Sequence, residues 1–215
     1  LLGVRIRLLA SVSSPSAFAE YRAWGQHHAV YAIASAEGVG VYNHLGERLT
    51  QHHWAQYTPI SLAALPRHRL LLVGCWGGQI LRIDMANPDH SYLAGVLNLP
   101  HATVGPNSIH ASQDEARLLV CASRSAFVFS INEYHHTVAL EHTLTGHEAA
   151  LTCGAFLHGG DMYITCDSHG RICLFNTTTG EMLDESYQHS QQINQITVHP
   201  TDNTFVTVSD DRTMR

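Results

Sequence analysis

Short apolar runs alternate with small and polar residues along most of the chain. The runs TPISLAAL, HRLLLVGC, QILRID and SYLAGVLNL follow one another between Thr58 and Leu99, and ALTCGAFL, DMYITC, RICLFN and EMLDESY follow in the same order between Ala150 and Tyr187. Runs of this length, bounded by Gly, Pro, Asn and Asp, predict β-strands joined by tight turns. No segment has the periodicity of an amphipathic helix. The pattern predicts an all-β fold.

The third run of each series ends in Asp or Asn, and this ending recurs at a steady spacing. It occurs at Asn43, Asp84, Asn132 and Asn176, and the run SDDRTMR projects a fifth to about residue 218, so the spacings are 41, 48, 44 and about 42. Repeats of this length are typical of four-stranded propeller blades. Such a small sheet cannot bury both faces alone, so we expect the sheets to stack radially as a β-propeller of four-stranded antiparallel blades.

A second signal agrees with this period. Gly146-His147 precedes Asn176 by 29 residues, and 29 residues before position 218 stands His189. With the blade period and the SDDRTMR run, the chain resembles the WD-repeat (WD40) family of β-propellers over nearly its whole length. Its repeats are degenerate, because the Trp-Asp pair of the family is replaced by Tyr42-Asn43, Ile83-Asp84, Ile131-Asn132 and Phe175-Asn176.

The resemblance implies a buried hydrogen-bonded tetrad. In the family it joins the His of the Gly-His pair, a strand hydroxyl, a turn Asp and the Trp. The last unit retains most of it, in His189, Ser209 or Thr207, and Asp211, and His147 is tetrad-like in the unit before. At the position of Asp211 the other units have Gly77, Ser125 and His169. We therefore expect those units to depend on packing.

The predicted domain organisation is a single WD40-like propeller domain over residues 1–215, incomplete at its C-terminus. It amounts to about five blades of a seven-bladed propeller, which needs about 300 residues, and we expect the fifth unit to continue after Arg215. The run GVRIRLLASV alternates between apolar and polar residues, which predicts a strand. The alternative is a targeting segment, since residues 1–19 are basic and contain several serines.

Composition excludes several classes of function. The formal net charge is -6 and the twelve Lys and Arg residues are scattered, which argues against nucleic-acid binding. No apolar run approaches the roughly 20 residues that span a bilayer, so no membrane insertion is predicted. The five cysteines are odd in number and lack a CxxC motif, which favours buried thiols of a reducing compartment and hence a cytoplasmic protein.

Histidine is the outlier of the composition, with 17 residues that include the doublets His27-His28, His52-His53 and His135-His136. Neighbours in a strand point to opposite faces, so a doublet does not converge on one metal ion. The chain also lacks a G-x-S-x-G elbow and a P-loop. The sequence predicts no metal site, no cofactor and no catalytic residue.

Surface recognition is the function that remains. In a propeller, the turns between second and third strands and the connections between blades share one rim. Large aromatic residues and Arg dominate interface energies. The candidate partner-binding residues are Trp76, Arg124, Trp54, His169 and Arg212, and the same loops contain Glu37, His52, His53 and His101. We expect a non-catalytic scaffold for protein or peptide partners, within a larger assembly such as a ciliary or trafficking complex. The alternative is an enzyme or small-molecule binder that uses the channel mouth.

Overall fold

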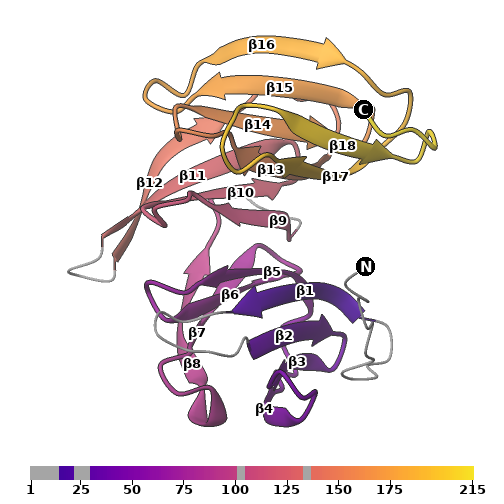
Figure 1. Ribbon diagram of the computed structural model, residues 1–215. Coiled ribbons are helices and arrows are strands. Elements are labelled where there is room, and N and C mark those ends of the chain that lie inside the picture. Colours follow the sequence, from indigo (N-terminus) through magenta and orange to yellow (C-terminus); the bar gives the residue numbers. More distant parts are fainter. Residues whose placement is uncertain (1–14, 22–29, 101–104, 133–136) are drawn as a thin grey trace.

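Five antiparallel sheets follow one another along the chain in the computed structural model (Figure 1). The structure describes residues 15–21, 30–100, 105–132 and 137–215. Within these residues the only helix is one turn of 3-10 helix, η1 (Pro88–His90). The strand expected over GVRIRLLASV, the doublets His27-His28 and His135-His136, and His101 lie outside the described residues.

The first four sheets each contain four strands, and each strand pairs with the next one along the chain. The first sheet contains β1 (Pro15–Tyr21), β2 (Val30–Ser35), β3 (Gly38–Tyr42) and β4 (Arg48–His52). The second contains β5 (Pro59–Leu65), β6 (Leu70–Cys75), β7 (Gln79–Asp84) and β8 (Tyr92–Asn98). The third contains β9 (Pro106–Ala111), β10 (Arg117–Ala122), β11 (Ser125–Asn132) and β12 (Thr137–Leu144). The fourth contains β13 (Leu151–Phe156), β14 (Met162–Asp167), β15 (Arg171–Asn176) and β16 (Met182–Tyr187).

The fifth sheet pairs β17 (Ile193–Val198) with β18 (Phe205–Ser209). The chain then turns back, and Thr213 to Arg215 lie beside β18: Met214 forms an isolated bridge with Val208, and the Arg215 amide donates to the Thr207 carbonyl at 3.0 Å. The strands of the second and fourth sheets match the runs predicted from the sequence to within two residues at each end, because each run is bounded by turn residues.

The sheets are arranged around a common centre. The first strands of successive sheets, β1, β5, β9, β13 and β17, pack side by side, whereas β4, β8, β12 and β16 are outermost. Figure 1 shows the sheets along an open arc, with the first and fifth sheets at its two ends. The architecture is that of a WD40-like propeller, as predicted, and closure into a ring is not seen among the described residues.

Each gap between neighbouring sheets contains its own apolar cluster. In β6, Leu71 and Val73 face the first sheet, whereas Leu72 faces the third. In β10, Leu119 faces the fourth sheet and Val120 faces the second. These strands read as continuous apolar runs because both of their faces are buried between sheets.

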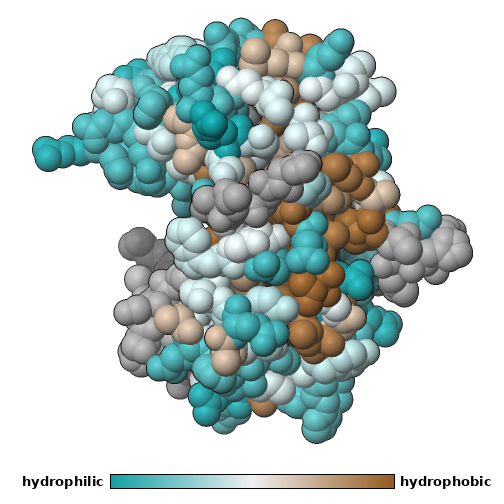
Figure 2. Space-filling model, turned by 180° about the vertical axis from the view of Figure 1, so that it is seen from behind, coloured by the Kyte–Doolittle hydropathy of each residue, from teal (hydrophilic) through white to brown (hydrophobic). Residues whose placement is uncertain are grey.

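The cluster between the second and third sheets is partly open at its margin. Figure 2 shows a band of hydrophobic surface on the back of the molecule. The band crosses the level where the first and second sheets, which lie below, meet the other three sheets, which lie above. The apolar side chains that pack on this cluster but are only partly buried are Leu70, Leu97, Ala111, Ile131 and Val138.

The five cysteines are all buried and none forms a disulfide. Burial raises the pKa of Cys75 to about 12, so this thiol stays protonated and behaves as a small apolar side chain. Among the described residues, no helix is long and apolar enough to cross a membrane.

Candidate interaction site

The strand order gives the propeller two different ends. Because consecutive strands of each sheet are antiparallel, the turns between second and third strands lie at the same end as the connections from one sheet to the next. We call this end the rim. It comprises the turns 36–37, 76–78, 123–124, 168–170 and 210–212 and the connections 53–58, 145–150 and 188–192. The turns between first and second strands, and between third and fourth strands, lie at the opposite end.

His147 anchors the rim of the fourth sheet from the connection that precedes β13. Its Nδ1 lies 2.8 Å from Asp167 Oδ2, and its Nε2 lies 2.8 Å from Thr165 Oγ1. Since a carboxylate only accepts, Nδ1 carries the proton and donates to Asp167. Burial lowers the pKa of His147, although the bond to Asp167 opposes this. In the neutral ring, Nε2 then accepts from the Thr165 hydroxyl.

His189 makes the same arrangement in the fifth sheet. Its Nδ1 lies 2.9 Å from Asp211 Oδ2, and its Nε2 lies 2.8 Å from Thr207 Oγ1. Thr207 therefore supplies the hydroxyl, whereas the Ser209 hydroxyl donates to the Gln191 carbonyl at 3.2 Å. Hydrogen bonds from Thr213 and from His189 lower the pKa of Asp211.

The expectation that the fourth unit depends on packing, because His169 stands at the position of Asp211, is wrong. Asp167 stands two residues earlier, as the last residue of β14, and reaches the His147 ring from there. The same carboxylate accepts from the His169 amide at 2.9 Å and from the Arg171 amide at 3.0 Å, so it also shapes the turn. One signal in the sequence points to this: Thr165 and Thr207 both stand 18 residues after their histidines.

Trp76 is the most exposed of the predicted partner-binding aromatics. It lies in the turn between β6 and β7, and 56% of its surface is exposed. Its amide donates to the Thr58 carbonyl at 3.0 Å, and Gly77 and Gly78 follow at φ 92° and 83°, which favours glycine. The backbone is thus held in place while the ring remains open to solvent.

Trp54 is placed differently, although it also belongs to the rim. It is half-buried and packs against the apolar cluster between the first and second sheets. Its ring stacks on His52 with centroids 5.6 Å apart, and His52 Nε2 lies 2.8 Å from Ser91 Oγ. Burial lowers the pKa of His52. These contacts make Trp54 part of the packing between two sheets.

The other three predicted residues are exposed on rim turns. Arg124, His169 and Arg212 lie in the turns of the third, fourth and fifth sheets, respectively. Within the part of the chain that the structure describes, their side chains make no hydrogen bond or ion pair. The strand order places them at the same end as Trp76, and their role in partner binding stays a prediction.

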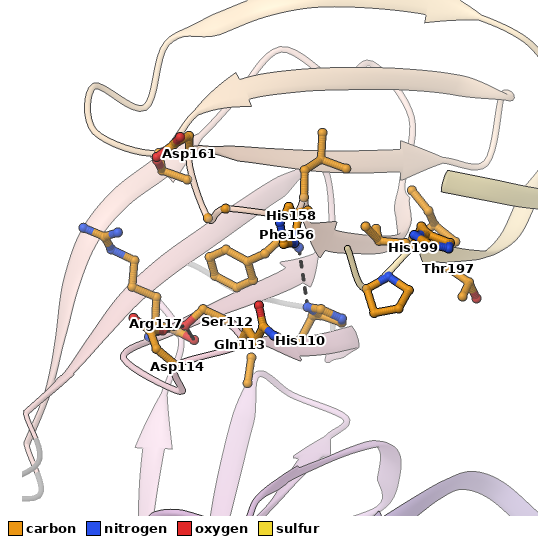
Figure 3. A pocket seen from close by; sticks show the side chains of 18 of the residues that line it. His110, Ser112, Gln113, Asp114, Arg117, Phe156, His158, Asp161, Thr197 and His199 are labelled. Atoms are coloured by element: carbon orange, nitrogen blue, oxygen red, sulfur yellow. Dashed lines mark hydrogen bonds between the residues drawn. The ribbon is translucent and has the colours of Figure 1, made fainter. Parts of the chain in front are cut away.

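A cavity of about 910 Å³ lies at the opposite end, where none of the predicted site residues is found (Figure 3). It is bordered by three successive turns between first and second strands, those of the third, fourth and fifth sheets. Its lining includes His110, Asp114, Phe156, His158, Asp161 and His199. The sequence contains these residues but gives no distance between turns that are more than forty residues apart. No group of three or more His, Cys, Asp or Glu among the described residues could hold a metal ion.

Comparison with known proteins identifies repeats in the C-terminal third of the chain. The family described as "WD domain, G-beta repeat" matches residues 139–176 and 180–215. These two stretches are WD40 repeats. Each of the two matched repeats contains one of the His–Thr–Asp networks, the first with His147 and the second with His189.

Two known proteins are similar over longer stretches. A Xenopus laevis protein, "p21-activated protein kinase-interacting protein 1-like", is 25% identical over 146 residues, which are 67% of this chain and 39% of that protein. The crystal structure of Saccharomyces cerevisiae Sqt1 has the same fold, with a TM-score of 0.74 at 16% identity, over 93% of this chain and 58% of Sqt1. The chain thus spans less than two thirds of either protein.

Proposed function

We propose that this WD40-repeat protein is a non-catalytic scaffold that binds protein or peptide partners through its rim. The observation that carries the proposal is Trp76, a large aromatic ring exposed on a turn whose backbone is fixed by Thr58 and two glycines. Exposed Trp and Arg side chains on rigid supports are typical of the residues that dominate binding energy. Arg124, on the rim turn of the next sheet, adds a polar donor of the same kind.

The name of the Xenopus relative describes a protein that interacts with a kinase, which supports a protein partner for this chain as well. We further propose that the protein is cytoplasmic and acts as a subunit of a multi-subunit complex, such as a ciliary or trafficking assembly, without binding nucleic acid. Five buried, unpaired thiols suit a reducing compartment, and the net charge of -6 with basic residues scattered along the sequence argues against nucleic-acid binding.

The test is affinity purification of the intact protein with mass spectrometry, in parallel for wild type and Trp76→Ala. We expect Trp76→Ala to weaken partner binding by about 2 kcal/mol, and Arg124→Ala by less, with the thermal melt unchanged. Glu148→Gln changes an exposed rim side chain of a different type and serves as the control. Normal recovery of every partner by Trp76→Ala, or loss of its fold, would contradict the assignment of the rim.

A further inference from the structure

Two of the five buried cysteines stand directly opposite each other in the fourth sheet. Cys153 of β13 pairs with Cys166 of β14 in the antiparallel ladder. Residues that oppose each other in this way have Cα atoms roughly 4.5 to 5.5 Å apart, which falls within the roughly 4.4 to 6.8 Å that a disulfide requires. Both side chains also lie on the same face, because both belong to the apolar cluster between the fourth and fifth sheets. The backbone therefore already holds the two cysteines at a spacing that a disulfide can bridge.

The two thiols interact with each other in the reduced protein. A hydrogen bond from the Cys166 thiol lowers the pKa of Cys153, although burial opposes this. The Thr152 hydroxyl, whose oxygen lies 3.7 Å from Cys153 Sγ, and the Ile196 amide are two further donors. Burial raises the pKa of Cys75 instead, to about 12. Three donors around one sulfur favour the thiolate, which is the form of cysteine that attacks an oxidant.

The other three cysteines face no cysteine across their ladders. Cys121 lies near β13, since a Cβ added at Gly154 would come 2.8 Å from Cys121 Sγ. However, Cys121 and Cys173 belong to the cluster between the third and fourth sheets. The fourth sheet thus separates them from the face that Cys153 shares with Cys166.

A small oxidant can reach this pair from the side of the fifth sheet. Ile193 and Ile196 of β17 belong to the same apolar cluster as the two cysteines, and Ile196 also lines the cavity at the end opposite the rim. The fifth sheet consists of β17 and β18 and lies at one end of the arc (Figure 1). Elements with few packing partners open locally at a low free-energy cost. Local opening of this sheet exposes the pair.

We propose that Cys153 and Cys166 are a redox-sensitive pair, which hydrogen peroxide converts from a dithiol into a cross-strand disulfide. The Cys153 thiol loses its proton and its sulfur attacks one peroxide oxygen, so that the O–O bond breaks and sulfenic acid and one water are formed. The Cys166 sulfur then attacks the sulfur of Cys153–SOH, and a second water leaves as the S–S bond forms. Overall, two thiols lose two electrons and two protons, and one peroxide is reduced to two molecules of water.

The bond forms next to residues that support the rim. Cys166 stands between Thr165 and Asp167, whose side chains hold His147. Because neighbours in a strand point to opposite faces, the disulfide lies on the other side of the sheet from this network. In a reducing compartment the dithiol is the resting state, and the disulfides that form there are usually transient or sense oxidants. The proposal does not depend on the proposed scaffold function.

The test is thiol mapping of the intact protein after exposure to hydrogen peroxide under native conditions. Catalase then removes the peroxide, guanidinium chloride unfolds the chain in the presence of iodoacetamide, and mass spectrometry locates the alkylated cysteines. We expect two of the five cysteines to escape alkylation and to appear in one peptide pair linked through Cys153 and Cys166. Treatment with dithiothreitol before alkylation should restore all five.

Two variants serve as the matched comparison. Cys166→Ala should abolish the reversible protection of Cys153, whereas Cys75→Ala, which also removes a buried thiol, should leave the linked peptide pair unchanged. Complete alkylation of all five wild-type cysteines after peroxide, or a linked pair that joins Cys121 to Cys153, would overturn the proposal. Reversible protection in Cys166→Ala equal to that in wild type would do the same. The wild-type map needs no substitution, so it decides the proposal even where a variant fails to fold.

Discussion

Asp167, the last residue of β14, holds His147 from a position two residues earlier in the repeat than the one from which Asp211, in the turn after β18, holds His189. The distances to Nδ1 are nevertheless nearly equal, 2.8 Å and 2.9 Å, and in both sheets a threonine hydroxyl lies 2.8 Å from Nε2. The network is therefore preserved by geometry rather than by position in the repeat. The fourth sheet uses Asp167 both to hold the ring and to accept the amides of its own turn.

The first prediction concerns this network. Asp167→Ala leaves the buried Nδ1–H of His147 without an acceptor, and His189→Ala leaves Thr207 unpaired, so each should lower the free energy of unfolding by about 1 to 3 kcal/mol. His169→Ala removes an exposed side chain that makes no such bond, and it should change stability by less than about 0.5 kcal/mol. Urea denaturation of the three variants measures this. A loss at His169 as large as at Asp167 would show that the hydrogen bonds contribute little.

A second prediction follows from the pKa of His147, which burial lowers despite Asp167. Below the ordinary histidine pKa of about 6.5, the unfolded chain takes up a proton that the native ring does not, so stability falls as the pH falls. Asp167 and Arg171 are the charged groups that act on this ring. His147→Gln should therefore lose less stability than wild type between about pH 7 and pH 5.5. Denaturant titrations at the two pH values give the comparison, and an identical loss in both proteins would exclude this contribution.

The third prediction tests how closely neighbouring sheets approach at the rim. Gly170 has φ 84°, and an added Cβ would lie 2.1 Å from the His189 carbonyl oxygen of the next connection. Gly160 has φ 73°, but nothing lies within 4 Å of its Cβ position. Gly160→Ala should cost about 1 kcal/mol from backbone strain alone, and Gly170→Ala clearly more. Thermal melts of the pair isolate the contact; equal costs would mean that the connection moves away freely.

Much of the fold could be predicted from the sequence, because strands that are buried on both faces are visible as continuous apolar runs. β6 and β10 are continuous apolar runs, and the turn residues between strands occur at the period of a blade. The sequence does not show in this way which residue contacts a histidine twenty residues away, so the repeat alignment points to His169 rather than to Asp167 as the partner position of His147. Likewise, the sequence does not distinguish Trp54 from Trp76, since both stand in predicted rim loops. Only the packing of the sheets shows that Trp54 is half-buried and stacked on His52, whereas Trp76 is exposed.

The cavity could not be predicted from the sequence, for a related reason. Its border joins residues of the third, fourth and fifth sheets, and no local pattern marks His110, Asp161 and Thr197 as neighbours. Each residue is ordinary in its own turn or strand. Only the radial stacking of the sheets places them around one space.

The final prediction concerns the fifth sheet, which lies at one end of the arc. The fifth sheet exposes Val206, Val208 and Met214, and β18 is paired on its second side only by the short return to Arg215. Exposed apolar faces and unpaired strand edges promote association between chains. A protein of residues 1–215 alone should therefore self-associate at micromolar concentration, which sedimentation velocity or light scattering measures.

The matched variant for this prediction is the double substitution Val206→Thr and Val208→Thr. It keeps the β-branched shape of both side chains but makes the exposed face polar, so it should reduce association without lowering the thermal midpoint by more than a few degrees. A Val198→Thr variant changes a partly buried side chain packed toward the fourth sheet and should not reduce association. A monomeric wild-type protein with a sharp unfolding transition would show instead that the five sheets are sufficient by themselves, and that the exposed valines on β18 attract no second chain.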